Sequence, residues 1–523
     1  MLKEIPLRYP ALLVLLASAA PAVAQWSSDA SINLALADAG GDQVQSKIRT
    51  LPDGSSYVSW FDNQTGGYDV RLQRLSAGGV EQWAHGGVLL ADRSYSSTVD
   101  YDLRVDAQGN ALVAFNDDRV ATDQITVVKV GAGGGVLWTV RVSSGSAFKA
   151  NPHLCVLSDG AIAAGWTEGS GYRLQRLSPE GVPLLASPLN VVETGRSLTM
   201  NDLAPGLSGA VMVSYTRPTG GFNTPKHIYA QSYTSAGAAA WATPRAVFDG
   251  GSLQFGSFPP IVADGAGGAV FAWYNTGGTR PALVQHLRAD GTEVFAHNGV
   301  ALSTDTTLIH TDPSAAYDPA TGVIYASWTV SNQLQSQWGW RAQAVSPAGA
   351  RSWTDAGRQL LPLSANQKSF ARAVADGHGM IASCFDARGP VSGVVLAAGV
   401  DEEGALRWSP ATLEACSVVS GKSRLEAAWN GTTALLAWGD GRHDGGDIYI
   451  QNVNPDGTLG PSAPPCTADF NGDGFVDFFD YDDFVSCFET GACPPGRTAD
   501  VNGDDFVDFF DYDDFVTQFE AGC

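Results

Sequence analysis

The sequence predicts an all-β protein, a ring of eight four-stranded blades called a β-propeller, followed by a small helical module. Two observations predict the ring. One unit of about 54 residues recurs along the chain, and its strands alternate polar and apolar residues between glycine turns. The composition agrees, because 60 glycines and only 16% charged residues suit short strands and tight turns better than long helices.

The first element of each unit is an apolar run that ends in a large residue, such as SYVSW in the first unit. The runs end at Trp60, Phe115, Trp166, Tyr215, Trp273, Trp328, Phe385 and Trp438, at spacings of 49 to 58 residues. A recurring aromatic residue could be a ligand platform. We expect it instead to pack one blade against the next, because a side chain needed in every unit serves the architecture.

The second element is an alternating strand, a turn with glycine, and a large apolar residue four positions later. The turn glycines are Gly79, Gly134, Gly181, Gly237, Gly291, Gly349, Gly404 and Gly457. The eighth unit stops after Gly457 without its last strand, whereas Trp26 and the following SINLALAD resemble that missing piece. Residues 25–460 are therefore expected to form a propeller that the N-terminal strand closes. Seven blades, an open repeat array or a stack of β-sandwiches are the alternatives.

Residues 1–24 are typical of a secretory signal peptide, with Lys3 and Arg8 before a short apolar run and an Ala-Val-Ala cleavage site. No later stretch is long and apolar enough for a transmembrane segment. We expect a secreted protein, found outside the cell or on its surface, in which disulfide bonds can form.

Four of the seven cysteines lie near the C-terminus and allow three pairings. We favour Cys466–Cys523 and Cys487–Cys493. The other three are Cys155, Cys384 and Cys416, an odd number, so at least one is expected to be a buried free thiol.

Candidate catalytic groups follow several apolar runs as Asp–Arg pairs, namely Asp117 with Arg119, Asp386 with Arg388 and Asp440 with Arg442. Because a catalytic site is needed only once, repetition favours pairs that stabilise turns. His443, in GDGRHDGGD, is expected to be an exposed loop residue. Asp-box repeats, a Gly-x-Ser-x-Gly elbow and an HExxH motif are absent from the sequence, so the catalytic residues are unknown.

The C-terminal segment, residues 466–523, follows a proline-rich linker at 461–465 and carries one acidic motif twice, 31 residues apart. Side-chain oxygens at positions 1, 3, 5, 9 and 12 of a loop, with a backbone carbonyl at position 7, are the ligands that Ca²⁺ prefers. The first set is Asp469, Asn471, Asp473, Phe475, Asp477 and Asp480. The second set is Asp500, Asn502, Asp504, Phe506, Asp508 and Asp511. We predict two Ca²⁺ sites whose occupancy is coupled to folding.

This duplicated, EF-hand-type pattern resembles the dockerin family. The resemblance implies two loop–helix units that attach a secreted protein, often a polysaccharide-degrading enzyme, to a cohesin-like partner. Positions 10 and 11, often used for partner contacts in that family, are Phe478-Phe479 and Phe509-Phe510 here. These pairs would suit an apolar groove on a partner, or they could pack the core of the module.

The net charge of −23 argues against nucleic acid as a partner. We favour a protein that is not an enzyme, with a propeller that binds a glycan or a protein and a tail that docks it through calcium. The alternative is an extracellular carbohydrate-active enzyme, a glycoside hydrolase or lyase in polysaccharide catabolism, with a propeller catalytic domain. A quinone-dependent dehydrogenase is a third hypothesis, which no vicinal cysteines support. Carboxylates in the propeller funnel held by unrepeated neighbours would favour the enzyme.

Overall fold

The computed structural model describes residues 26–94, 101–119, 122–221, 223–277, 279–461, 467–471, 476–494, 497–502 and 506–521. The predicted signal peptide and the predicted Cys466–Cys523 bond lie outside these residues, as do three predicted calcium ligands, Asp473, Phe475 and Asp504. The chain consists of two compact units, and Pro461 is the last residue of the first.

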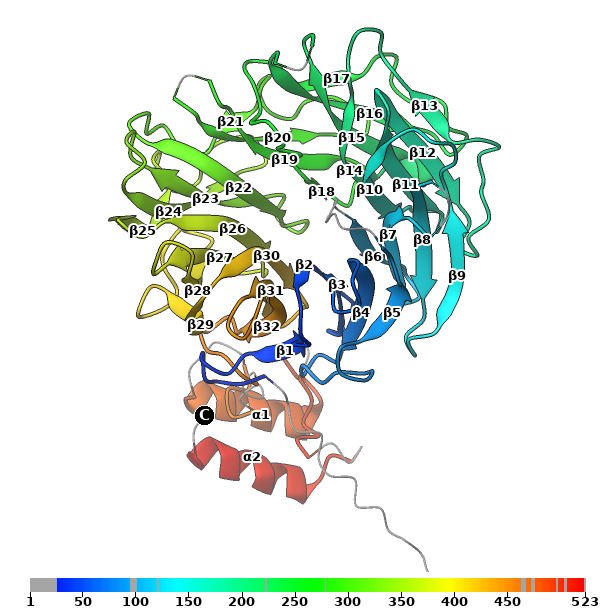
Figure 1. Cartoon of the computed structure of the whole chain (residues 1–523). Helices are drawn as coiled ribbons and strands as arrows, with labels where there is room; N and C mark the ends of the chain where they lie inside the picture. Colours follow the sequence, from blue (N-terminus) through cyan, green and yellow to red (C-terminus); the bar gives the residue numbers. More distant parts are fainter. Residues whose placement is uncertain are drawn as a thin grey trace, which may run out of the picture. The chain divides into compact units, whose positions relative to one another are not determined.

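The first unit is a propeller of eight four-stranded antiparallel sheets that follow one another around a central axis (Figure 1). Blade 1 holds β2 (Gln43–Thr50), β3 (Ser56–Asp62), β4 (Asp69–Leu75) and β5 (Val88–Ala91). Blade 2 holds β6 (Asp102–Val105), β7 (Ala111–Asp117), β8 (Gln124–Val130) and β9 (Val136–Arg141). Blade 3 holds β10 (Lys149–Val156), β11 (Ile162–Glu168), β12 (Gly171–Leu177) and β13 (Leu189–Val191). Blade 4 holds β14 (Thr199–Pro205), β15 (Val211–Pro218), β16 (Lys226–Tyr233) and β17 (Arg245–Phe248).

The second half of the ring repeats this order. Blade 5 holds β18 (Ile261–Ala263), β19 (Ala269–Tyr274), β20 (Ala282–Leu287) and β21 (Val300–Ala301). Blade 6 holds β22 (Ile309–Tyr317), β23 (Ile324–Ser331), β24 (Trp338–Val345) and β25 (Arg358–Ser364). Blade 7 holds β26 (Lys368–Ala375), β27 (Gly379–Ala387), β28 (Gly393–Asp401) and β29 (Leu413–Ser420). Blade 8 takes β30 (Lys422–Trp429), β31 (Ala434–Asp440) and β32 (Asp447–Val453) from the end of the propeller and β1 (Leu34–Ala37) from its start.

The N-terminal strand closes the ring, as predicted. Leu34 pairs with Ile450 and Ala35 with Tyr449, so β1 is the fourth strand of blade 8. Closure removes the exposed edge that an open array of sheets would leave. The prediction of eight blades is confirmed, and the alternatives of seven blades, an open array and separate sandwiches are wrong.

An apolar cluster lies between each pair of successive blades, including blades 8 and 1. Seven of the predicted large residues lie in these clusters, each against the preceding blade, so their packing role is confirmed. The seventh unit differs by one residue. Cys384 takes that position between blades 6 and 7, whereas Phe385 faces blade 8. Cysteine is small and is often buried, so the pattern of large aromatic residues did not identify Cys384 as the residue that packs against blade 6.

The predicted turn glycines join each blade to the one before it. All eight have φ between 77° and 87°, a conformation that favours glycine. The ring of Trp26 packs so closely over Gly79 that an added Cβ would lie 2.6 Å from it, and the Trp26 indole N–H donates to the Ala77 carbonyl at 3.0 Å. The same packing recurs with Trp83, Trp138, Leu185, Trp241, Phe295, Trp353 and Trp408 over the glycine of the following blade. The residue four positions after each turn is therefore an interlock between blades.

The second unit contains α1 (Phe478–Thr490) and α2 (Phe509–Ala521). Its core consists of Phe470, Phe484, Cys487, Ala499 and Phe515, with the Phe484 and Phe515 rings stacked at 3.8 Å. The predicted Cys487–Cys493 disulfide is present. Cys155, Cys384 and Cys416 are buried free thiols, as expected. Among the described residues, neither helix has the length and apolar character needed to cross a bilayer.

Candidate functional site

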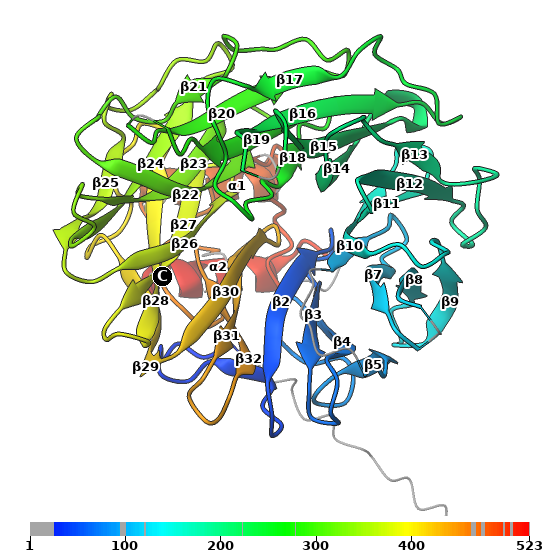
Figure 2. The same ribbon diagram turned by 45° about the horizontal axis from the view of Figure 1, so that its top comes forward.

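A cavity of about 430 Å³ lies on the axis of the ring, where the first strands of the blades converge (Figure 2). Residues from β2, β6, β10, β14, β18, β22, β26 and β30 all line it. We call this cavity the channel. It is the only part of the propeller for which all eight blades supply described residues to one cavity, so it is where ring closure creates a site.

One equivalent position of the first strand faces the channel in every blade, and it carries different chemistry around the ring. It pairs with a small residue of the second strand, as in Lys47 with Ser59 and His153 with Gly165. The eight residues are Lys47, Asp102, His153, Asp202, Pro260, Ser314, Arg372 and Glu426. The repeats have therefore diverged where they face the channel and agree where they pack.

The first strands are bulged where they approach the channel. Pairing of β2 with β3 shifts between Val44 and Lys47, and similar shifts occur in blades 3, 6, 7 and 8. Five non-glycine residues in these bulges have φ between 50° and 62°: Gln45, Asn151, Asp312, Phe370 and Arg424. Such backbone costs about 1–3 kcal/mol per residue and gathers at functional sites. Bulges re-aim side chains, and two of these five residues, Asp312 and Arg424, line the channel.

An ion network covers one side of the channel. The Arg104 guanidinium donates to Asp102 Oδ1 at 2.8 Å and to Asp202 Oδ1 at 3.0 Å, and Nε donates to the Leu154 carbonyl. Both carboxylates are buried. Burial alone would lower the pKa of Arg104, but Asp102 and Asp202 outweigh it and raise that pKa. Arg104 therefore holds blades 2, 3 and 4 together as a permanent cation.

Asp102, His153 and Asp202 place one ligand atom each within 4.8 Å of one another. Such a group could hold a metal ion. Arg104, however, already supplies positive charge to both carboxylates, and His153 Nδ1 lies 3.5 Å from Asp202 Oδ1. We therefore interpret this group as part of the ion network.

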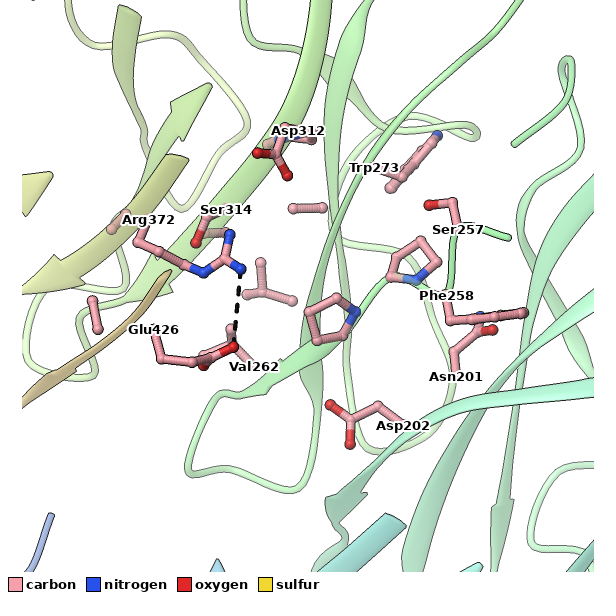
Figure 3. Close-up of a pocket in the computed structure, with 18 of the residues that line it drawn as sticks. Asn201, Asp202, Ser257, Phe258, Val262, Trp273, Asp312, Ser314, Arg372 and Glu426 are labelled. Carbon is pink, nitrogen blue, oxygen red and sulfur yellow. Dashed lines mark ion pairs between the residues drawn. The ribbon is translucent and has the colours of Figure 1, made fainter. Parts of the chain in front are cut away.

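The other side of the channel carries cations with weaker partners. Arg372 lies 3.9 Å from Glu426, the ion pair drawn in Figure 3. Arg424 is exposed and has no carboxylate within 4 Å among the described residues. Arg49, 3.7 Å from Asp102, shares that carboxylate with Arg104, and burial lowers its pKa, which Arg104 lowers further. The charge of these arginines is not fully compensated, so they are the groups of the channel best able to bind an anion.

Asp312 is the carboxyl group with the most unusual environment in the channel. It occupies a bulge with φ of 55°, and its Oδ2 accepts the Ala371 N–H at 3.1 Å. Burial raises the pKa of Asp312 although Arg372 acts in the opposite direction. Burial, and then the charge of Asp312, also raise the pKa of Tyr274. A carboxyl group of this kind can donate a proton closer to neutral pH than an ordinary aspartate.

A second cavity, of about 690 Å³, adjoins the channel and shares Ser257 and Phe258 with it. Phe255 is 62% exposed and Phe258 is 42% exposed. The Lys226 ammonium lies 5.4 Å from the centre of the Phe255 ring. We call this cavity the groove. Exposed aromatic faces beside hydroxyl groups can stack on sugar rings, so the channel and groove together could hold an extended ligand.

The predicted Asp–Arg pairs form outside the channel. Arg119 donates to both oxygens of Asp117 at 2.8 Å, and Asp386 and Asp440 pair with Arg388 and Arg442. None of these six residues lines the channel. Each Asp pairs with the Arg two residues later, as expected for pairs within turns, and His443 is an exposed loop residue as predicted.

Sequence reasoning missed the channel residues. A usable signal was present, because these residues precede the buried large residue of their unit by 12 to 14 positions. An alignment of the eight units on that residue would have shown one polar, variable position before an apolar one.

The two acidic loops of the C-terminal unit fold around their last predicted ligands. Asp480 is fully buried, and its oxygens accept the backbone N–H groups of Asn471 and Asp477 at 2.9 Å each. Asp511 is buried in the same way and accepts from Val501, Asn502 and Asp508. Burial would raise the pKa of Asp511, but these N–H donors outweigh it and lower that pKa.

The remaining described ligands lie in the same loops. Asp477 and Asp508 each accept a helix N–H at 2.8 Å, from Phe479 and Phe510. Asp469, Asn471, Asp500, Asn502 and Phe506 belong to the loop segments that precede the helices. Each oxygen of Asp480 accepts one N–H and keeps a lone pair. The donor set is all oxygen and suits Ca²⁺, so the described residues fit the predicted ion.

The four phenylalanines at positions 10 and 11 are exposed. Phe478, Phe479, Phe509 and Phe510 expose 69%, 66%, 68% and 67% of their area. The alternative in which they pack the core of the module is therefore wrong. They begin α1 and α2 and leave an apolar surface on this unit.

No protein-family model and no curated protein matches the sequence. Solved structures of similar fold include a PL25 ulvan lyase bound to -[GlcA(1-4)Rha3S]-, with 12% identity and a TM-score of 0.43 over 83% of this chain and 97% of that one. The polysaccharide lyase Uly1 has 10% identity and a TM-score of 0.41 over 80% and 91%. The Dos1 propeller has 11% identity and a TM-score of 0.44 over 80% and 94%. These similarities concern the propeller fold alone.

Proposed function

We propose that the propeller binds an anionic polysaccharide in the channel and groove, and that the C-terminal unit attaches the protein to an extracellular, cohesin-like partner. The observation that carries the first part is the set of arginines that line the channel with incomplete carboxylate pairing, Arg49, Arg372 and Arg424. Arginine recognises carboxylate and sulfate groups through paired N–H donors.

The shape of the site supports a glycan over a folded protein. The channel lies between the first strands of eight blades, and the groove, which shares Ser257 and Phe258 with it, extends this space past Phe255. A chain of sugars can enter such a path with its acidic groups on the arginines and a ring on an aromatic face. The signal-like N-terminus supports a location outside the cell, where such polymers occur.

The attachment function rests on the dockerin-like tail. The duplicated loops, the buried Asp480 and Asp511, and the exposed phenylalanine pairs support a calcium-stabilised module with an apolar contact surface. Calcium would neutralise the loop carboxylates and hold the two helices in place. The phenylalanines would then provide the partner contact.

Replacing Arg372 by Gln is expected to weaken binding of uronate-containing or sulfated oligosaccharides at least about tenfold, roughly 1.4 kcal/mol. The reason is loss of a cation whose carboxylate partner among the described residues, Glu426, lies 3.9 Å away. Titration calorimetry of the full chain would measure it. Arg351→Gln, at an ion pair with the exposed Asp355, is the matched control and should leave affinity unchanged. Equal binding of neutral and acidic oligosaccharides would contradict the proposal.

A second candidate function is cleavage of the bound polysaccharide, which the strained, half-buried Asp312 favours. As a general acid it must be protonated, so turnover should fall as pH rises through its raised pKa. Asp312→Asn is expected to lower the release of reducing ends at least about 100-fold while the oligosaccharide still binds. Product analysis by mass spectrometry measures this. If the unsubstituted protein releases no reducing ends from any acidic polysaccharide that it binds, binding is its function and cleavage is not.

A further inference from the structure

The seam where the N-terminus joins blade 8 brings two glycine-rich acidic segments together. Asp42 and Gly446 form an isolated parallel β-bridge, and the Gln43 N–H donates to the Gly446 carbonyl at 2.7 Å. Gly41 N–H donates to Asp444 Oδ2 at 3.2 Å. We call residues 38–42 and 441–447 the seam.

One carboxylate in the seam has no partner. Asp447 is 0% exposed, and neither of its oxygens has a hydrogen-bond partner among the described residues. No Lys, Arg or His lies within ion-pair distance of it in that part of the chain. A buried charge without hydrogen bonds or a counter-ion is strongly unfavourable, so something must neutralise it.

Blade 1 provides an internal comparison. Asp69 opposes Asp62 across two strands just as Asp447 opposes Asp440. The carboxylate of Asp69 accepts the Thr65 hydroxyl and the Arg93 N–H, both at 2.7 Å. In the seam, the loop between the strands is Gly-Arg-His-Asp-Gly-Gly and contains no hydroxyl group. The missing partner is therefore particular to blade 8 and is not a property of the repeat.

The charges around Asp447 do not compensate it. Asp444, Asp38 and Asp440 act on it with the same sign, and His443, the nearby group of opposite sign, is exposed. The other positive groups of the seam are engaged elsewhere: Arg442 and Lys422 pair with Asp440, and His85 pairs with Asp38. Asp42 and Asp444 also have no cation within 4 Å among the described residues.

We propose that the seam binds a hard divalent cation, Ca²⁺, through Asp447 and Asp444 together with oxygen donors of the two glycine-rich segments. Carboxylate and carbonyl oxygens are the ligands that Ca²⁺ prefers, and glycines let a backbone approach an ion closely. The ion would hold the segment that follows β1 against the loop that precedes β32. It would therefore act as a clasp on the closed ring, separate from the C-terminal loops.

Counting bound ions tests the proposal on the full chain. Asp447→Asn is expected to lower the Ca²⁺ bound per chain, measured by equilibrium dialysis and elemental analysis, by one. Asp69→Asn, at the equivalent position of blade 1, should leave the number unchanged. Equal Ca²⁺ content in the unsubstituted protein and Asp447→Asn would overturn the proposal, whatever the C-terminal loops bind.

Hydrogen exchange of the same proteins locates the effect. In the unsubstituted protein, amides of β1 should exchange at least about tenfold faster in EDTA than in Ca²⁺. In Asp447→Asn they should be insensitive to EDTA. If that variant does not fold, Asp444→Asn serves in its place. An exchange rate of β1 that is the same with and without Ca²⁺ in the unsubstituted protein would also overturn the clasp.

Discussion

Removal of calcium is expected to unfold the C-terminal unit while β11 and β15 in the propeller stay folded. Residues 466–523 carry 15 acidic side chains against one basic residue, Arg497, and its apolar core is small. At an ion concentration 100 times the dissociation constant, each site contributes about 2.7 kcal/mol to stability. Hydrogen exchange of the full chain in EDTA should show α1 and α2 losing at least about 100-fold of protection, whereas peptides from β11 and β15 should not change.

Two double variants separate the ion sites from general charge effects. Asp480→Asn with Asp511→Asn should lose protection of α1 and α2 even in excess Ca²⁺, because these buried carboxylates organise the loops. Asp482→Asn with Asp513→Asn removes the same charge from exposed positions of the same helices. This variant should retain the protection of α1 and α2 in Ca²⁺. Helices that are equally protected with and without calcium would show that the loops are not calcium sites.

Replacing Arg104 by Ala is expected to destabilise the propeller by about 3–5 kcal/mol, because two buried carboxylates lose their closest cation. Among the described residues, Asp102 then keeps only Arg49, at 3.7 Å, and Asp202 keeps only His153, at 3.5 Å. Asp102 and Asp202 come from blades 2 and 4, and Arg104 contacts both directly. Urea unfolding followed by tryptophan fluorescence would measure the loss.

Arg351→Ala is the control for this change. Arg351 pairs with Asp355, whose side chain is 78% exposed, and such surface pairs contribute at most about 1 kcal/mol. Arg104→Lys keeps the charge but has no fork with which to bridge two carboxylates, so an intermediate loss is expected. A loss for Arg104→Ala no larger than for Arg351→Ala would show that the network adds nothing to stability.

The interlocks between blades were predictable because each uses a local pattern. A turn glycine and a large residue four positions later recur with little change, and the missing eighth copy pointed to Trp26. The packing of the seventh unit could not be predicted in the same way. Cys384 replaces the aromatic residue there, and only the packing against blade 6 shows that Phe385 is displaced by one position.

By itself, the sequence determined the eight units, the closing strand and the two acidic loops with their spacing. Of the three cysteine pairings that the sequence allows, the structure shows Cys487–Cys493. The tertiary structure alone decided that Phe478 and its counterparts are exposed, that Arg104 bridges two carboxylates, and that Asp447 has no partner. The physical reason is the separation along the chain of the residues that interact. Strand patterns and loop ligands act over a few residues, whereas the channel and the seam join side chains from different blades, which come together only when the ring closes.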